Sequence, residues 1–191
     1  MNYYDIVSSE RTLSFLTDRL IVSGDLSHAD SESVLEQLDY WVSKGVTDVL
    51  DVRAECSDEN FVGKHQPQMK YNHLGVHDDG APRDPLWFAA GVKVTLDAFA
   101  RSSDSKVLIH CHMGINRAPS MAYAVLLSQG VDCVKALDII RSSRPIAQII
   151  YADSALKWFS SLHPSVDYRE SKNRVDAWFD ANFTRLGRWN F

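Results

Sequence analysis

Two kinds of hydrophobic pattern alternate along the chain. Short runs of apolar residues indicate buried strands, whereas apolar residues that recur every three or four positions indicate amphipathic helices. The short runs predict strands at residues 19–24, 46–52, 71–76 and 106–110. The longer stretches predict helices at residues 30–44, from 84 onward, 118–129, 132–142 and 153–162. The segments predicted to lack regular structure are residues 53–70 and the loop 77–83. Because strands and helices alternate, we expect an α/β fold with a central, mostly parallel mixed sheet flanked by helices.

Polar residues and glycines mark where several helices begin and end. Asp30 can cap the first helix, and Gly45 is placed to end it. Asp84 followed by Pro85 predicts another helix start, with the aspartate as cap and the proline at the first helical position. The side chains predicted to line the buried faces of two later helices are Phe88, Val92, Leu96 and Phe99, and Val134, Leu137 and Ile140.

The C-terminal part of the chain forms a separate aromatic segment. We divide the chain into residues 1–163 and a C-terminal helical extension, residues 164–191. The apolar residues that fall on one helical face of this extension are Val175, Trp178, Phe179, Phe183 and Leu186. We expect this face to pack on the chain's own core. The alternative is a homodimer, or contact with another partner, through the same aromatic helix.

Length, composition and charge narrow the function classes. With 191 residues, of which 45% are hydrophobic and 24% charged, the chain is expected to form one globular domain with a substantial core. A formal charge of −5 argues against broad, nonspecific binding to nucleic acid. No apolar run approaches the length that spans a bilayer, and residues 1–5 lack the basic start and apolar core of a signal peptide. We therefore expect no membrane partner.

The cysteines bear on cofactors and on the redox setting. Cys56, Cys111 and Cys133 are odd in number and lack the spacing of a metal site. We expect a reduced, cytoplasmic setting, because it keeps a nucleophilic thiol free. We expect neither a metal nor another cofactor.

The candidate chemistry lies in residues 110–120, HCHMGINRAPS. Cys111 stands between a predicted strand and a predicted helix, so it faces the unpaired N–H groups and the positive dipole end of that helix. Those groups favour a thiolate, and they also bind phosphate. Arg117 can donate two parallel hydrogen bonds to phosphate oxygens. Gly114 suits a loop whose N–H groups turn towards one anion. The segment therefore predicts a phosphatase site.

This segment resembles the signature of the cysteine-dependent protein tyrosine phosphatases. The resemblance rests on His-Cys-x5-Arg with Gly114 within the loop, and the short chain is similar to the dual-specificity branch. It covers roughly residues 19–162 and also includes the loop with upstream acids and Arg144-Pro145, in the family's order. It implies that residues 1–163 form a dual-specificity phosphatase-like catalytic domain and that the substrate is a phosphorylated protein.

The resemblance also implies roles for residues of the loop. Cys111 is expected to attack phosphorus, and Arg117 to bind substrate and stabilise the transition state. His110 is expected to support the loop through hydrogen bonds rather than to transfer protons. The residues expected to bind the substrate phosphate, through backbone N–H groups, are His112, Met113, Gly114, Ile115, Asn116 and Arg117. We call residues 111–117 the phosphate-binding loop.

The family uses an aspartate on an upstream loop as general acid. In this chain Tyr71 opens the preceding segment and points to Asp78, seven positions later. Asp79 is the alternative, because a shift of one residue at the strand end would exchange the two. Asp84 is better explained as a helix cap. We call residues 77–83 the acid loop.

Ala118 departs from the family pattern, which places Ser or Thr directly after the loop arginine to assist breakdown of phosphocysteine. Ser120, about half a turn further round the helix, is the candidate supporting substitute. Slow hydrolysis of the intermediate is therefore our hypothesis.

The loop composition bears on the substrate. Relatives that act on inositol phospholipids tend to carry lysine in this loop, and this loop has none. We expect phosphotyrosine as the substrate group, with phosphoserine and phosphothreonine as further candidates. The alternatives are an RNA 5′-phosphatase of the same superfamily and a catalytically weak module that binds phosphoproteins.

Overall fold

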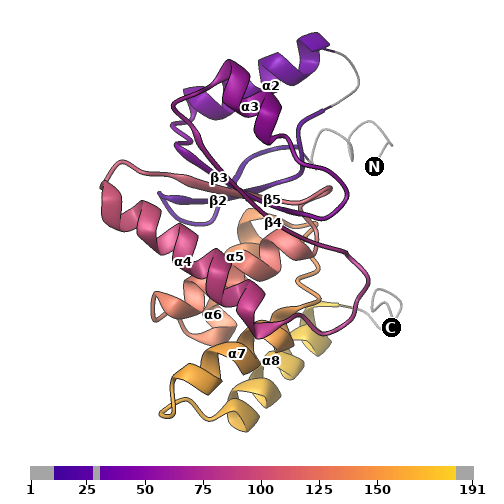
Figure 1. Ribbon diagram of the computed structural model, residues 1–191. Coiled ribbons are helices and arrows are strands. Elements are labelled where there is room, and N and C mark those ends of the chain that lie inside the picture. The colour runs from indigo at the N-terminus through magenta and orange to yellow at the C-terminus, as the bar shows by residue number, and fades with distance from the viewer. Residues whose placement is uncertain (1–10, 28–30, 184–191) are drawn as a thin grey trace.

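A five-stranded mixed sheet forms the centre of the molecule (Figure 1). The computed structural model describes residues 11–27 and 31–183. The strands are β1 (Ser14–Phe15), β2 (Leu20–Ser23), β3 (Asp48–Arg53), β4 (Lys70–Val76) and β5 (Val107–His110), in the order β1-β2-β5-β3-β4. The edge strand β1 pairs antiparallel with β2, and the other neighbours are parallel. This arrangement confirms the predicted α/β fold with a mostly parallel sheet.

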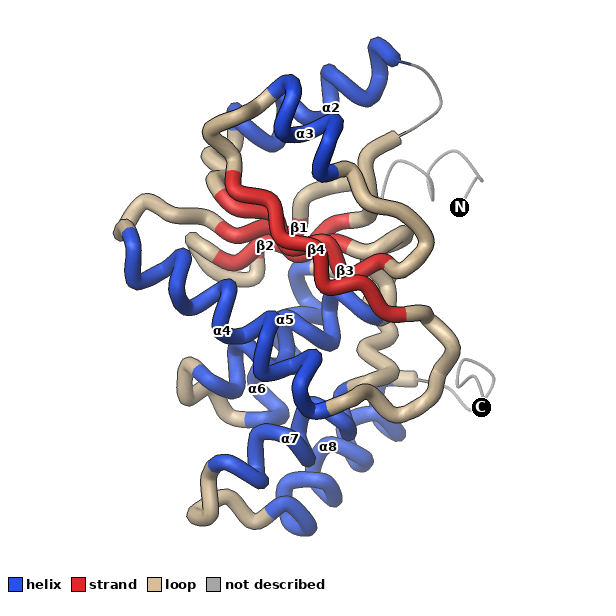
Figure 2. Tube along the Cα trace, in the orientation of Figure 1, coloured by secondary structure: helices blue, strands red, loops and turns tan. Residues whose placement is uncertain are grey.

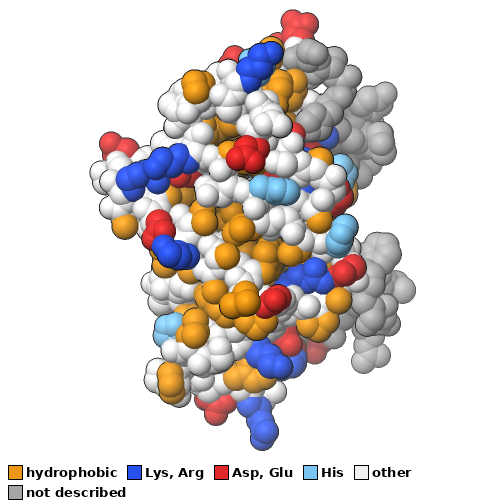
Figure 3. All heavy atoms as spheres, viewed as in Figure 1, with side chains coloured by type: hydrophobic (Ala, Val, Ile, Leu, Met, Phe, Trp, Pro, Cys, Tyr) orange, Lys and Arg blue, Asp and Glu red, His pale blue; other side chains and the backbone are white. Residues whose placement is uncertain are grey.

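Helices cover both faces of this sheet (Figure 2). They are α2 (Ser31–Ser43), α3 (Glu59–His65), α4 (Pro85–Arg101), α5 (Arg117–Ser128), α6 (Cys133–Ser143), α7 (Ala152–Leu162) and α8 (Tyr168–Asn182). Helices α2 and α3 lie on one side of the sheet, and α4 to α8 lie on the other. The face that carries α4 shows hydrophobic side chains interspersed with charged ones (Figure 3).

Each face of the sheet has its own hydrophobic core. Leu38 and Trp41 of α2 pack with Val62 of α3 on one side. On the other side the core contains Phe88 and Met121. Helix α5 is buried from Arg117 to Leu127 because it lies between the sheet and the outer helices. The residue that opens α5 is therefore fixed by packing on every side, which positions the loop before it.

Most predicted elements are present, with two omissions. Residues 53–70 were predicted to be irregular, which is wrong, because α3 lies within them. Helix α3 has seven residues and buries only Val62, too few for a helical period to show in the sequence. Strand β1 has two residues and was missed for the same reason.

The predicted buried faces are correct only in part. In α4, Leu96 and Phe99 are half-buried, whereas Thr95 and Ala98 are buried. In α6, Val134 is half-buried, while Cys133 and Ala136 are buried. The buried positions of both helices thus include smaller side chains. A pattern based on hydrophobicity alone assigns larger apolar residues to those positions.

The helix ends follow the predicted chemistry where the structure describes them. The Asp84 side chain accepts a hydrogen bond from the Leu86 N–H, and Pro85 begins α4. Gly45 has a φ of +83°, a left-handed conformation that suits glycine after a helix. Asp30, the predicted cap of α2, lies outside the described residues.

Helix α8 packs against α6 and α7, with the aromatic face turned inward. Val175, Trp178 and Phe183 are buried within the single chain. The Trp178 Nε1–H donates to Asp138 Oδ1 at 2.6 Å. Leu186, assigned to the same face, lies outside the described residues. Contact of this helix with a second copy stays a prediction.

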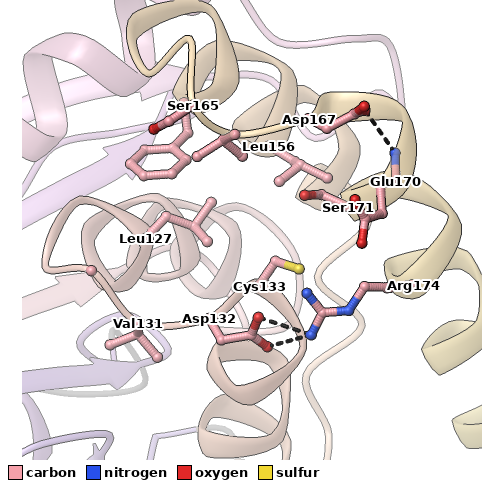
Figure 4. Close-up of a pocket in the computed structure, with 13 residues that line it drawn as sticks. Leu127, Val131, Asp132, Cys133, Leu156, Ser165, Asp167, Glu170, Ser171 and Arg174 are labelled. Atoms are coloured by element: carbon pink, nitrogen blue, oxygen red, sulfur yellow. Dashed lines mark hydrogen bonds and ion pairs between the residues drawn. The ribbon is translucent and has the colours of Figure 1, made fainter.

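A hollow of about 380 Å³ remains beside the start of α8 (Figure 4). Arg174 reaches from α8 to Asp132 at the start of α6, and the nearest N···O distance is 2.8 Å. Cys133 also lines this hollow, which shares no lining residue with the pocket described below. Over residues 11–27 and 31–183, no helix is both long and apolar enough to cross a membrane.

Candidate active site

The carboxyl ends of three parallel strands meet at one edge of the sheet. Glu55 follows β3, Asp78 follows β4 and Cys111 follows β5. In open α/β sheets this edge is where ligands bind. A pocket of about 490 Å³ opens there. The residues that line it are Glu55, Asp78, Cys111, His112, Met113, Ile115, Asn116, Arg117, Gln148 and Ile150.

The phosphate-binding loop surrounds a buried sulfur. Cys111 is 1% exposed and directly follows the central strand β5, while Arg117 is the first residue of α5. Among the described residues, no acceptor pairs with the backbone N–H groups of residues 112–117. Buried N–H groups are almost always paired, so this run of free donors provides an anion-binding surface at a helix N-terminus.

Gly114 has a supporting position in the loop. Its φ is +63°, and it does not line the pocket, although it was predicted to bind substrate. A Cβ at this position would meet the Ser23 backbone at 2.6 Å and Arg144 Nη2 at 2.5 Å. Gly114 therefore permits the loop to lie close against β2 and against Arg144.

Arg144 holds the outer side of the phosphate-binding loop. Its side chain is almost fully buried and donates from Nε to the Gly114 carbonyl at 2.5 Å and from Nη2 to the Met113 carbonyl at 2.9 Å. Nη1 donates to the Thr12 carbonyl and to Ser14 Oγ, both at 3.1 Å. Two loop carbonyls thus face the guanidinium rather than the anion site. The sequence analysis counted Arg144-Pro145 among the features of the resemblance but gave Arg144 no role, since burial of an arginine has no local signal.

Arg117 is held by a carboxylate that the sequence analysis missed. Its Nη1 and Nη2 donate to the two carboxylate oxygens of Glu55 at 2.6 and 2.7 Å, and Nη1 also donates to the Val76 carbonyl at 2.9 Å. These hydrogen bonds from Arg117 lower the pKa of Glu55 to about 2. Burial opposes the charge on Arg117, but Glu55 and the nearby Cys111 raise the arginine pKa overall. The available signal was an acid two residues after the end of a buried strand.

The structure separates the three candidate acids. Asp78 lines the pocket, accepts from Asn116 Nδ2 at 3.1 Å, and lies 3.6 Å from Arg117 Nε. Asp79 is directed to Arg83, with which it pairs, and does not line the pocket. Asp84 caps α4, as predicted. Of the three, Asp78 alone lines the pocket together with Cys111.

His110 does not make the hydrogen bonds expected of it. Neither ring nitrogen has a hydrogen-bond partner among the described residues, and Nε2 lies 3.9 Å from Asp51 Oδ1. Side chains alternate along a strand, so the ring points with Leu108 towards α2, where its centroid is 5.6 Å from that of Trp41. Burial lowers the pKa of His110. The ring therefore makes no hydrogen bond to the loop among the described residues, and its supporting role stays a prediction.

A buried charge network supports the loop instead. Arg53 is fully buried and pairs with Asp51, Asp58 and Asp25 at 2.9, 2.6 and 3.0 Å. Asp25 in turn lies 2.8 Å from His112 Nδ1, and its N–H donates to the His112 carbonyl at 3.1 Å. The network joins the ends of β2 and β3 to the start of the phosphate-binding loop.

The hydroxyl of Ser120 is not directed at the pocket. Ser120 is fully buried, and its Oγ accepts from the Tyr151 N–H at 3.2 Å. Ala118 is also fully buried and supplies no hydroxyl beside Cys111. Within the described residues, the candidate substitute therefore contacts the segment behind the acid loop.

Known proteins share both the sequence pattern and the fold. A family model described as the dual specificity phosphatase catalytic domain matches residues 30–158. Dual specificity protein phosphatase 2 of Homo sapiens is 29% identical over 103 residues, which are 53% of this chain and 31% of that protein. Dual specificity protein phosphatase 4 of Gallus gallus is 27% identical over 124 residues, which are 64% of this chain and 30% of that protein. This chain thus spans about three tenths of the length of these relatives.

A solved structure extends the likeness to the fold. The crystal structure of human DUSP28 matches with a TM-score of 0.63 at 18% identity, and the match covers 78% of this chain and 94% of that chain. The comparisons favour neither the RNA 5′-phosphatase nor the weak binding module. The family model covers most of the chain, including the pocket and both loops around it. The chain therefore belongs to the dual-specificity phosphatase family of the cysteine-dependent protein tyrosine phosphatases.

Proposed function

We propose that this protein removes phosphate from phosphotyrosine in protein substrates through a phosphocysteine intermediate. The observation that carries the proposal is the run of unpaired N–H groups around the buried sulfur of Cys111, beside the guanidinium of Arg117. Such preorganised donors stabilise the negative charge that develops on phosphoryl oxygens.

The first step transfers the phosphoryl group to sulfur. The Cys111 thiolate attacks phosphorus, so that a sulfur–phosphorus bond forms as the bond to the ester oxygen breaks. A protonated Asp78 carboxyl gives its proton to the leaving phenolate. Arg117 and the loop N–H groups hold the other phosphate oxygens.

The second step returns the enzyme to its starting state. A water molecule attacks phosphorus, Asp78 accepts its proton, and the sulfur–phosphorus bond breaks to release inorganic phosphate and the thiolate. Because Ala118 supplies no hydroxyl to the departing sulfur, we expect this step to be slow. A burst of product equal to the enzyme concentration would support this, and a linear time course from the first turnover would refute it.

The pocket favours an aromatic phosphate ester. Met113, Ile115 and Ile150 give it apolar walls, and Cys111 is almost fully buried beneath them. A tyrosine side chain carries its phosphate further from the peptide backbone than serine does, and its ring can contact those walls. Among the described lining residues, Arg117 is the only arginine or lysine, which suits one phosphate rather than several.

Turnover of phosphotyrosine peptides and para-nitrophenyl phosphate tests the proposal. Cys111→Ser should abolish turnover of both, whereas Cys133→Ser, a buried cysteine outside the pocket, should retain it. Asp78→Asn should reduce turnover by about 10²- to 10⁴-fold, most for poor leaving groups. Retained turnover in Cys111→Ser would refute the mechanism. The Asp78 effect appearing in Asp79→Asn instead would refute the acid assignment.

A further inference from the structure

The acid loop is attached to the segment that leads into α7. The Tyr151 hydroxyl donates to Asp78 Oδ1 at 2.7 Å and accepts from the Gly80 N–H at 3.1 Å. Tyr151 is 2% exposed, and its own N–H donates to Ser120 Oγ on α5 at 3.2 Å. One hydroxyl therefore joins the candidate acid and the loop backbone to the most buried helix of the domain.

Arg83 holds the same loop from its outer side. Its guanidinium lies 4.6 Å from the centre of the Tyr151 ring and donates to the carbonyls of His77 and Ala81, both at 2.8 Å. The Arg83 N–H donates to Ser154 Oγ of α7 at 3.2 Å. The two ends of the acid loop are thus tied together over the tyrosine ring.

The two oxygens of Asp78 have different partners. Oδ1 accepts from Tyr151, while Oδ2 accepts from Asn116 Nδ2 at 3.1 Å and lies 3.6 Å from Arg117 Nε. Because Tyr151 holds one carboxyl oxygen and the other lies beside the phosphate-binding loop, the Asp78 carboxyl group cannot rotate freely. We propose that Tyr151 is a positioning residue that holds Asp78 ready to protonate the leaving group.

This inference rests on the proposed role of Asp78 as general acid. Burial and the hydrogen bond to Asp78 raise the pKa of Tyr151 to about 12, so the hydroxyl stays protonated and can donate throughout the neutral range. Correct placement of a catalytic group accounts for a large share of its effect on rate. Loss of the tyrosine hydroxyl should therefore act on the step that Asp78 assists and leave phosphate binding intact.

Tyr151→Phe tests this directly, because it removes the hydroxyl and keeps the ring under Arg83. With phenyl phosphate, a poor leaving group, we expect kcat to fall about tenfold with little change in KM. With dinitrophenyl phosphate, whose leaving group needs no proton, kcat should change less than about twofold. The matched control is Tyr168→Phe, which removes a similar 2.8 Å hydrogen bond to Asp153 outside the pocket and should leave both rates unchanged.

The double variant separates positioning from a structural effect. In an Asp78→Asn background, Tyr151→Phe should cause no further loss on phenyl phosphate. The inference would be overturned if Tyr151→Phe lowered kcat equally on both substrates. It would also be overturned if Tyr151→Phe lowered kcat on phenyl phosphate as much in the Asp78→Asn background as in the wild type. If Asp78→Asn itself has no leaving-group dependence, the acid assignment fails first and the inference falls with it. Hydrogen exchange at the Gly80 N–H gives a readout independent of turnover, and no acceleration in Tyr151→Phe would also overturn the inference.

Discussion

Replacing Arg144 by methionine should disrupt anion binding without touching the pocket. The guanidinium lies behind the phosphate-binding loop and donates to the carbonyls of Met113 and Gly114 at 2.9 and 2.5 Å. Methionine keeps much of the apolar volume but leaves both buried carbonyls without this donor. We expect at least one loop peptide to turn, so that a carbonyl replaces an N–H at the anion site.

The size of the effect follows from the hydrogen bonds involved. A hydrogen bond with a charged partner contributes about 1.5–3 kcal/mol, so losing the two loop contacts should lower the free energy of unfolding by about 3–6 kcal/mol. Loss of the hydrogen bonds to Thr12 and Ser14 adds to this decrease. Loss of one charge-assisted hydrogen bond to the bound anion should weaken the binding of inorganic phosphate roughly 10- to 100-fold. The total free energy of unfolding of a domain is only about 5–15 kcal/mol, so the variant should fold with clearly reduced stability.

Urea unfolding and competitive inhibition by inorganic phosphate measure the two effects. Arg141→Met is the matched control, because Arg141 also donates to a backbone carbonyl, that of Ala147 at 2.7 Å, but does not contact the phosphate-binding loop in the structure. It should lose stability without losing phosphate affinity. Full phosphate affinity in a folded Arg144→Met protein would refute the idea that this arginine shapes the loop.

Three further predictions concern pH and packing. The hydrogen bonds from Arg117 lower the pKa of Glu55 from 4.5 to about 2, so this pairing stabilises the fold above about pH 4.5 and is lost as the pH falls towards 2. The wild-type protein should therefore melt at a higher temperature than Glu55→Gln at pH 6, and the difference should shrink towards pH 3. Burial lowers the pKa of His110 below 6.5, so as the pH falls the unfolded chain is protonated at this histidine before the folded one, and the free energy of unfolding decreases below about pH 6.5. In urea unfolding, His110→Asn should make this decrease shallower by up to about 1.4 kcal/mol per pH unit. An unchanged dependence on pH would refute the prediction. Gly114→Ala places a Cβ at φ +63° against the Ser23 backbone, which should cost about 2–5 kcal/mol in urea unfolding and weaken phosphate binding; wild-type values for both would contradict the described loop geometry.

Local pattern was enough to predict most of the fold and the centre of the site. The short apolar run before Cys111 and the helix-forming run after it can both be recognised locally, so the loop between them could be placed from sequence. The same holds for the acid loop, whose end is marked by Asp84 and Pro85. These features depend on neighbours in the chain.

The residues that complete the site depend on contacts between distant segments. Glu55 reaches Arg117 only because the sheet order brings the ends of β3 and β5 together, and no local pattern gives that order. The choice between Asp78 and Asp79 depends on a single residue of register at the end of β4. The face of β5 on which His110 lies could have been inferred from strand alternation, but its lack of hydrogen bonds could not.

The hydrogen bond from Arg144 to the Thr12 carbonyl has a consequence for biosynthesis. It joins residues 132 positions apart, so the loop that binds the anion cannot be completed until the chain has been made beyond α6. A long closure of this kind carries an entropic cost that only late contacts offset. On the ribosome, an emerging chain would hold its nucleophile in an unfinished site, and competence to bind phosphate would arise only after Arg144 has left the exit tunnel.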